Sequence, residues 1–145
     1  KMSRREVTEA QKAWARAVTD QDIDQLLALY HSGTLEEPLL FKPTLSDVIR
    51  LDHAGARSYF VGGDPAYPQD HGFLNCNWKQ VKFQSAGGPI PCSGGYGYMD
   101  MGQYMFLDED ENPTCADYTF VYHKIRGHVL ISLHHSSLTW HPSVA

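Results

Sequence analysis

Two histidines and two serines follow one another near the end of the chain, at His134, His135, Ser136 and Ser137. An imidazole exchanges protons near neutral pH, and a hydroxyl group both donates and accepts hydrogen bonds. Side chains of these two kinds supply the few convergent polar groups of many small-molecule pockets. The run is therefore the strongest candidate for a functional site in this sequence.

The four residues lie within a predicted β-strand at 129–140. Because successive side chains of a strand point to opposite faces, His135 and Ser137 share one face and His134 and Ser136 share the other. The first face also carries the apolar residues Val129, Ile131 and Leu133. We predict that His135 and Ser137 face a pocket with apolar walls. On periodicity alone, a solvent-exposed polar strand end is the better interpretation.

The first thirty residues are predicted to form two helices. Apolar residues recur every three or four positions from Val7 to Val18, the spacing of one helix face. The polar step 19–22 supplies capping residues, and a second short helix follows from Ile23. Further along, Asp52 is placed to cap a third helix that runs through Phe60.

The second half is predicted to be nearly all strand. A short strand at 35–41 contains Pro38, which indicates a sheet edge or a bulge. Longer strands are predicted at 73–83, 96–107, 114–125 and 129–140, separated by turns. Helices followed by long antiparallel strands indicate an α+β fold in which the helices cover one face of a bent sheet. With no internal repeat or linker, we expect one domain over residues 1–145.

The composition excludes several classes of function. The net charge is −5 and no basic run is present, so we expect no nucleic-acid partner. No apolar stretch approaches the roughly 20 residues of a membrane span. Three widely spaced cysteines predict free thiols and an intracellular, reducing compartment. Because the chain starts with Lys1 rather than Met, we expect a processed form or a piece of a longer protein.

The closing hairpin resembles that of a known superfamily. The segments 116–124 and 130–137 are similar to the last two strands of SnoaL-like, nuclear-transport-factor-like proteins, in the branch of the calmodulin-dependent kinase association domain. His-His-Ser-Ser, together with the upstream segment 43–46 (Pro-Thr-Leu-Ser) and the pair Tyr59-Phe60, resembles the iota-class carbonic anhydrases. The resemblance implies a cone-shaped, strongly bent antiparallel sheet with the N-terminal helices on its concave face.

The resemblance also implies an activity, the reversible hydration of carbon dioxide to bicarbonate in a small apolar pocket. Thr44, Tyr59, His135 and Ser137 would be the catalytic residues, with His135 as the base and the hydroxyl groups stabilising negative charge. The residues expected to bind the substrate are Thr44, Tyr59, Leu133, His134 and Ser136. A homodimer is implied, as is a soluble protein of the plastid stroma, where eukaryotic relatives are found.

A metal site made by this chain is not predicted. None of the eight histidines has the spacing of a known metal motif. His134 and His135 point to opposite faces of a regular strand, so they do not share one ion. We therefore expect no cofactor, with manganese or zinc as the alternative that the resemblance leaves open.

Two other functions remain open at this point. The domain could be a non-catalytic assembly module, and the alternating aromatic residues from Tyr96 to Phe106 fit either a core or a second subunit. It could also be another small-molecule lyase or isomerase, since this fold hosts many chemistries. A long, steroid-sized cavity would favour the latter.

Overall fold

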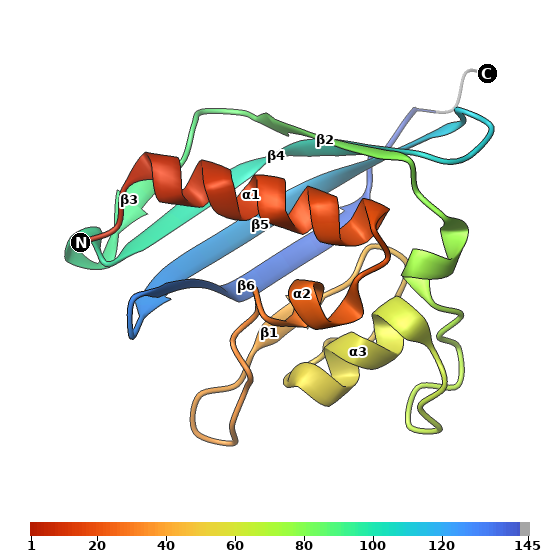
Figure 1. Ribbon diagram of the computed structural model, residues 1–145, viewed down its shortest axis with the longest axis horizontal. Coiled ribbons are helices and arrows are strands. Elements are labelled where there is room, and N and C mark those ends of the chain that lie inside the picture. Colours follow the sequence, from red (N-terminus) through yellow and green to blue (C-terminus); the bar gives the residue numbers. More distant parts are fainter. Residues whose placement is uncertain (143–145) are drawn as a thin grey trace.

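A computed structural model of the chain describes residues 1–142 and contains one bent, six-stranded sheet (Figure 1). The strands are β1 (Leu40–Lys42), β2 (Gln80–Ser85), β3 (Ile90–Cys92), β4 (Gly97–Leu107), β5 (Pro113–Ile125) and β6 (His128–Leu138). Their order is β1-β6-β5-β4-β2, with β3 beside β4. All pairs are antiparallel except β1 with β6, which is parallel. The α+β prediction is confirmed, with this one parallel edge added.

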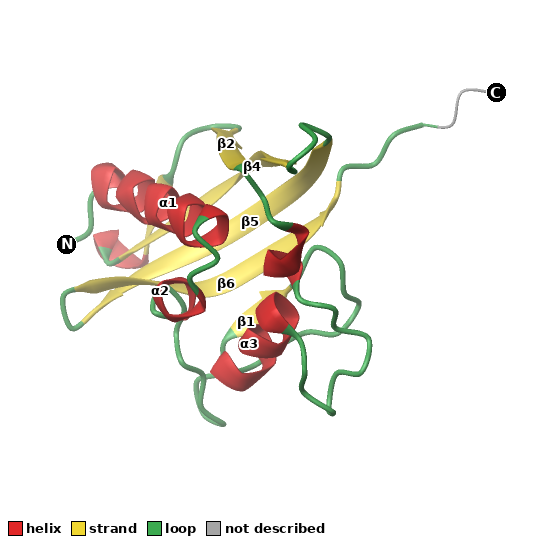
Figure 2. Ribbon diagram, turned by 45° about the vertical axis from the view of Figure 1, so that its right-hand side comes forward, coloured by secondary structure: helices red, strands yellow, loops and turns green. Residues whose placement is uncertain are grey.

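The helices α1 (Arg4–Thr19), α2 (Ile23–Leu27) and α3 (His53–Val61) lie on the same side of the sheet (Figure 2). Helix α1 begins at a capping box in which Ser3 and Glu6 bond each other's backbone N–H. Asp22 and Asp52 cap α2 and α3 through their carboxylates. The starts of α2 and α3 therefore agree with the expectation from capping residues, and Ser3 of α1 is a cap that was not predicted.

Aromatic side chains fill the space between the helices and the sheet. Every second residue of β4 and β5 points inward, which places Tyr104, Phe106 and Phe120 in the core. Trp14 of α1 stacks on Tyr104 with ring centres 5.6 Å apart. The alternating aromatic residues near the end of β4 thus pack on the core, whereas Tyr96 lies before the strand and is exposed.

Two predicted strands differ from the structure. The segment 73–83 begins as a 3-10 helix (Phe73–Cys76), turns through left-handed Asn77, and becomes strand only at β2. The segment starts with two consecutive buried residues, Phe73 and Leu74, which does not fit the alternation of a strand. The indole of Trp78 donates to the carbonyl of Phe73 at 3.0 Å. Residues 73–78 therefore pack against the core and do not pair with another strand. The strand predicted at 35–41 is reduced to β1.

A β-bulge in β6 changes which side chains face inward. Tyr122 of β5 pairs with Ile131 but its neighbour Val121 pairs with Leu133, so Ser132 is an extra residue. The hydroxyl of Ser132 occupies the irregular position by donating to the carbonyl of Val121 at 3.2 Å. One extra residue moves every later side chain to the opposite face.

The prediction that His135 and Ser137 share the face of Ile131 is therefore wrong. Beyond the bulge, His134 and Ser136 are the buried residues, whereas His135 is exposed and Ser137 half-buried. Within residues 1–142, no helix is both long and apolar enough to cross a membrane.

Candidate active site

The imidazole of His134 lies in the centre of the core with both nitrogens bonded. Tyr30 lies 2.8 Å from Nδ1, and Tyr104 lies 2.9 Å from Nε2. The ring stacks between Phe120, at 4.0 Å between ring centres, and Phe41, at 4.9 Å. Burial holds the pKa of His134 well below its usual value, so the ring is neutral.

The hydrogen bonds assign the proton of this neutral ring. The indole nitrogen of Trp14 can only donate, and it donates to Tyr30 at 2.9 Å. Among residues 1–142, the Tyr30 hydroxyl has only His134 as a further partner, so its own proton goes to Nδ1. The imidazole proton therefore sits on Nε2 and is donated to Tyr104.

The hydrogen-bonded series continues from His134 through three hydroxyl groups, those of Tyr104, Ser136 and Thr44. Tyr104 donates to Ser136 at 2.5 Å, and the oxygen of Ser136 lies 2.6 Å from that of Thr44. Ser136 accepts from Tyr104, and one of the two hydroxyls, Ser136 or Thr44, donates in the bond that joins them. Thr44 is the last hydroxyl of this series, and it lies beside Tyr59.

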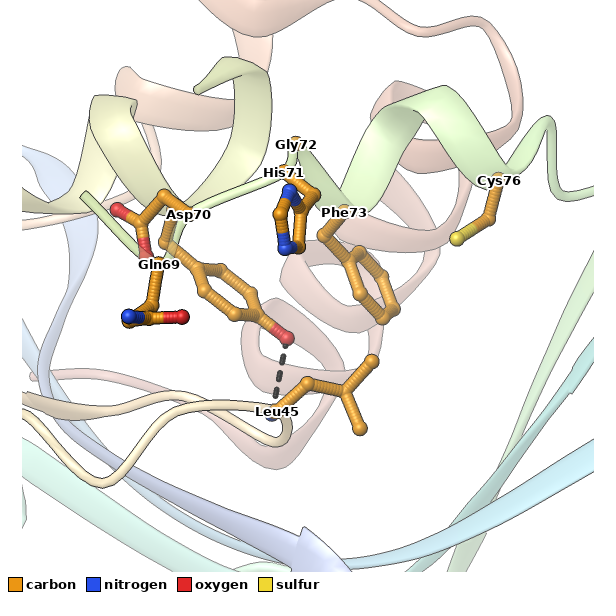
Figure 3. Close-up of a pocket in the computed structure, with 8 residues that line it drawn as sticks. Leu45, Gln69, Asp70, His71, Gly72, Phe73 and Cys76 are labelled. Atoms are coloured by element: carbon orange, nitrogen blue, oxygen red, sulfur yellow. Dashed lines mark hydrogen bonds between the residues drawn. The ribbon is translucent and has the colours of Figure 1, made fainter. Parts of the chain in front are cut away.

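Tyr59 of α3 places a further hydroxyl group beside Thr44. Its oxygen accepts a hydrogen bond from the backbone N–H of Leu45 at 3.1 Å, drawn as the dashed line in Figure 3. Burial raises the pKa of Tyr59, and the bonds from Leu45 and Thr44 oppose this only in part. Tyr59 therefore stays protonated at neutral pH and is a second donor.

A cavity of about 100 Å³ is lined by Tyr59 and by Leu45, the residue that follows Thr44. Its walls are formed by Leu45, Tyr59, Gln69, Asp70, His71, Gly72, Phe73 and Cys76 (Figure 3). Since one water occupies roughly 30 Å³ in the liquid, the cavity holds about three water-sized molecules. It suits a ligand of a few heavy atoms and is much smaller than a steroid-sized pocket.

A buried ion pair holds one wall of the cavity. Both terminal nitrogens of Arg50 donate to the carboxylate of Asp70, at 2.7 and 2.8 Å, and Ser58 donates to it at 2.6 Å. Arg50 is almost fully buried and lies over the ring of Tyr67, 4.0 Å from its centre. The hydrogen bond from Arg50 is the main reason why the pKa of Asp70 is lowered. The loop that carries residues 69–73 is thus tied to α3.

Comparison with known proteins decides the family. Residues 5–138 match the family described as metal-independent carbonic anhydrase. This chain belongs to the metal-independent carbonic anhydrase family. A protein of that name from Nostoc sp. strain PCC 7120 is 36% identical over 133 residues, which cover 89% of this chain and 61% of the relative. The chain thus spans less than two thirds of the length of that relative.

Solved structures agree with this family and with the fold. The iota-carbonic anhydrase of a cyanobacterium, crystallised with bicarbonate, superposes with a TM-score of 0.82 at 32% identity, covering 97% of this chain and 94% of the other. A putative calcium/calmodulin-dependent protein kinase II association domain from Xanthomonas campestris gives a TM-score of 0.72 at 23% identity, covering 96% and 89%. At that lower identity the likeness shows the fold.

The predicted site residues of this carbonic anhydrase family member divide into two groups. Thr44, Tyr59, His134 and Ser136 come together on the inner face of the sheet. The other three, Leu133, His135 and Ser137, alternate with them on the outer face. There His135 and Ser137 line an open hollow together with Asp117 and Thr119.

Three residues that take part in this hydrogen-bond network were not predicted as site residues: Trp14, Tyr30 and Tyr104. The inner cluster is defined as Thr44, Tyr59, Tyr104, His134 and Ser136. Tyr104 was part of the alternating aromatic pattern, and Trp14 was expected only as a core residue at helical spacing, which it also is. Tyr30 carried no signal of its own. Knowledge of the β-bulge in β6 would have identified these residues, because the bulge turns His134 toward Trp14, Tyr30 and Tyr104.

The described residues 1–142 contain no group of three or more His, Cys, Asp or Glu side chains placed to hold a metal ion. Both nitrogens of His134 are occupied by tyrosine hydroxyl groups. The site presents the hydroxyl group of Tyr59 to a ligand, and the side chains of Gln69, Asp70, His71 and Cys76 also line the cavity.

Proposed function

We propose that this domain catalyses the reversible hydration of carbon dioxide to bicarbonate at the inner cluster, without a metal ion. The observation that carries the proposal is the hydrogen-bonded series from His134 to Thr44, which ends beside Tyr59, a wall residue of a cavity of about 100 Å³. Membership of the metal-independent carbonic anhydrase family supports it.

The arrangement suits the charge changes of the reaction. Carbon dioxide is apolar and is accepted by walls such as Phe73 and Leu45. As a water oxygen bonds to the carbon, negative charge moves onto the carbon dioxide oxygens. The hydroxyl groups of Thr44 and Tyr59 donate to that charge from a site that is already ordered, so little reorganisation is needed.

Each residue of the inner cluster has a proposed role. Thr44 and Tyr59 contact the substrate and the transition state. Ser136, Tyr104 and His134 act behind them, because they fix the direction in which the Thr44 hydroxyl points. Leu133, His135 and Ser137 are not included, since their side chains lie on the other face of the sheet.

A direct assay tests the proposal. The purified chain is dialysed against a chelator, and carbon dioxide hydration is followed by stopped-flow with a pH indicator. We expect turnover that chelation does not reduce and that Thr44→Val lowers about 100-fold or more, as for loss of one donor to a developing oxyanion. An inactive chain with an intact fold would reject the proposal.

The homodimer and the plastid location remain predictions that rest on resemblance. Exposed apolar side chains on the sheet, among them Met99, Met101 and Leu138, support a dimer through this face. Light scattering in solution tests it, and a monomer at micromolar concentration would argue against it.

A further inference from the structure

The proposed reaction releases a proton, and the inner cluster offers no good acceptor for it. His134 has lone-pair capacity only at Nδ1, which already accepts from Tyr30, and burial lowers its pKa. Burial raises the pKa of Tyr59 and of Tyr104, so both are donors at neutral pH. A base for the attacking water must therefore come from another wall of the cavity.

Four titratable side chains line the cavity: Tyr59, Asp70, His71 and Cys76. Asp70 is held by Arg50 and Ser58, and its pKa is lowered, which makes it a weak base. Burial is the main reason why the pKa of the Cys76 thiol is raised, so at neutral pH it keeps its proton. His71 is the remaining group, and a neutral imidazole has one nitrogen lone pair that can accept a proton.

His71 also has the access to solvent that a proton acceptor requires. The residue is exposed, and its ring forms part of the cavity wall between Asp70 and Phe73 (Figure 3). The turn that places it there needs Gly72, whose φ is 87° and whose added Cβ would lie 2.4 Å from the side chain of Asn75. The Asn75 amide in turn donates to the carbonyl of His71 at 3.0 Å.

We propose that His71 is the proton acceptor of the hydration step and returns the proton to solvent. This inference rests on the proposed function. The water oxygen bonds to the carbon of carbon dioxide, one carbon–oxygen π pair moves onto an oxygen held by Thr44 and Tyr59, and the water proton passes through cavity water to His71. The imidazolium then gives the proton to the buffer, so that bicarbonate and one proton are the products.

Chemical rescue tests this assignment. Wild type, His71→Ala and the control His128→Ala, altered at an exposed residue next to the β5–β6 turn, are compared at saturating carbon dioxide with increasing imidazole. We expect His71→Ala to turn over about 100-fold more slowly at low buffer, the lower end of general-base contributions. Added imidazole should restore most of the rate, whereas the wild type and His128→Ala should respond little.

The outcomes separate the two proposals. An inactive wild type rejects the proposed function itself. An active wild type with equal turnover in His71→Ala overturns the role of His71 and leaves the function standing. A slow His71→Ala that imidazole does not restore, with an unchanged melting temperature, assigns His71 a structural role and also overturns the inference.

Discussion

The hydroxyl oxygens of Thr44 and Ser136 lie 2.6 Å apart although 92 positions separate the two residues in the chain. The parallel pairing of β1 with β6 brings the loop after β1 to the end of β6, and Lys42 strengthens this contact by donating to the carbonyl of Ser136 at 3.0 Å. The bulge at Ser132 is what turns Ser136 toward Thr44. A single inserted residue thus completes the donor series.

Removing the Tyr59 hydroxyl should lower turnover strongly and the free energy of unfolding only slightly. We expect Tyr59→Phe to lower turnover roughly 100-fold or more, because one donor to the developing charge is lost. The cost in unfolding free energy should be about 1 kcal/mol, since the N–H of Leu45 loses its partner. Stopped-flow hydration and urea denaturation measure the two effects. Tyr96→Phe, at an exposed position, is the matched control, and equal activity of both variants would remove Tyr59 from the site.

The buried neutral His134 should make stability depend on pH. Its folded pKa is depressed, so below about pH 6.5 the unfolded chain binds a proton that the folded chain does not. Stability should therefore fall with decreasing pH in this window, by about 1.4 kcal/mol per unit from this residue. Urea denaturation from pH 7.5 to 5 measures the slope.

The adjacent histidine supplies the control for this measurement. His134→Gln should lose that part of the slope, and His135→Gln, altered at an exposed side chain, should retain it. Equal slopes in the two variants would show that His134 is not the residue that titrates. The comparison is independent of any enzymatic assay.

The ion pair behind the cavity should contribute strongly to stability. Asp70→Ala leaves the buried guanidinium of Arg50 without its carboxylate, which should cost about 3 kcal/mol or more. Glu109→Ala removes an exposed partner of Lys79 and should cost less than about 1 kcal/mol. Guanidinium denaturation compares them, and similar losses in both variants would contradict the distinction between buried and exposed pairs.

Much of the fold could be predicted because its signals are local. Ser3, Asp22 and Asp52 are helix caps whose bonds reach only three residues along the chain. Long runs of β-branched and aromatic residues likewise indicate β4, β5 and β6 without knowledge of their partners. The strand predicted to begin at Phe73 was wrong, because the apolar residues there form a 3-10 helix that packs on the core and does not pair with another strand.

The site was predicted only in part, since its decisive feature is not local. Three consecutive apolar residues precede Ser132, and pairs of like residues, His134-His135 and Ser136-Ser137, follow it, so residue types alone do not reveal the bulge or decide which residue of each pair faces inward. Thr44 and Tyr59, both named by resemblance, lie beside each other, and their catalytic role stays a prediction. Regular alternation placed His135 and Ser137 on the wrong face. The roles of Trp14 and Tyr30 depend on where their polar atoms lie, which periodicity does not describe.

The most direct test compares Ser136→Ala with Ser137→Ala, two neighbours of one type on opposite faces of β6. Carbon dioxide hydration by the chelated protein is the measurement, with unfolding free energies to establish that both variants fold. We predict that Ser136→Ala loses most of the turnover, because Thr44 loses the hydroxyl partner that orients it, and that Ser137→Ala stays within about twofold of wild type. Full activity in Ser136→Ala, or a selective loss in Ser137→Ala, would contradict the inner-face site.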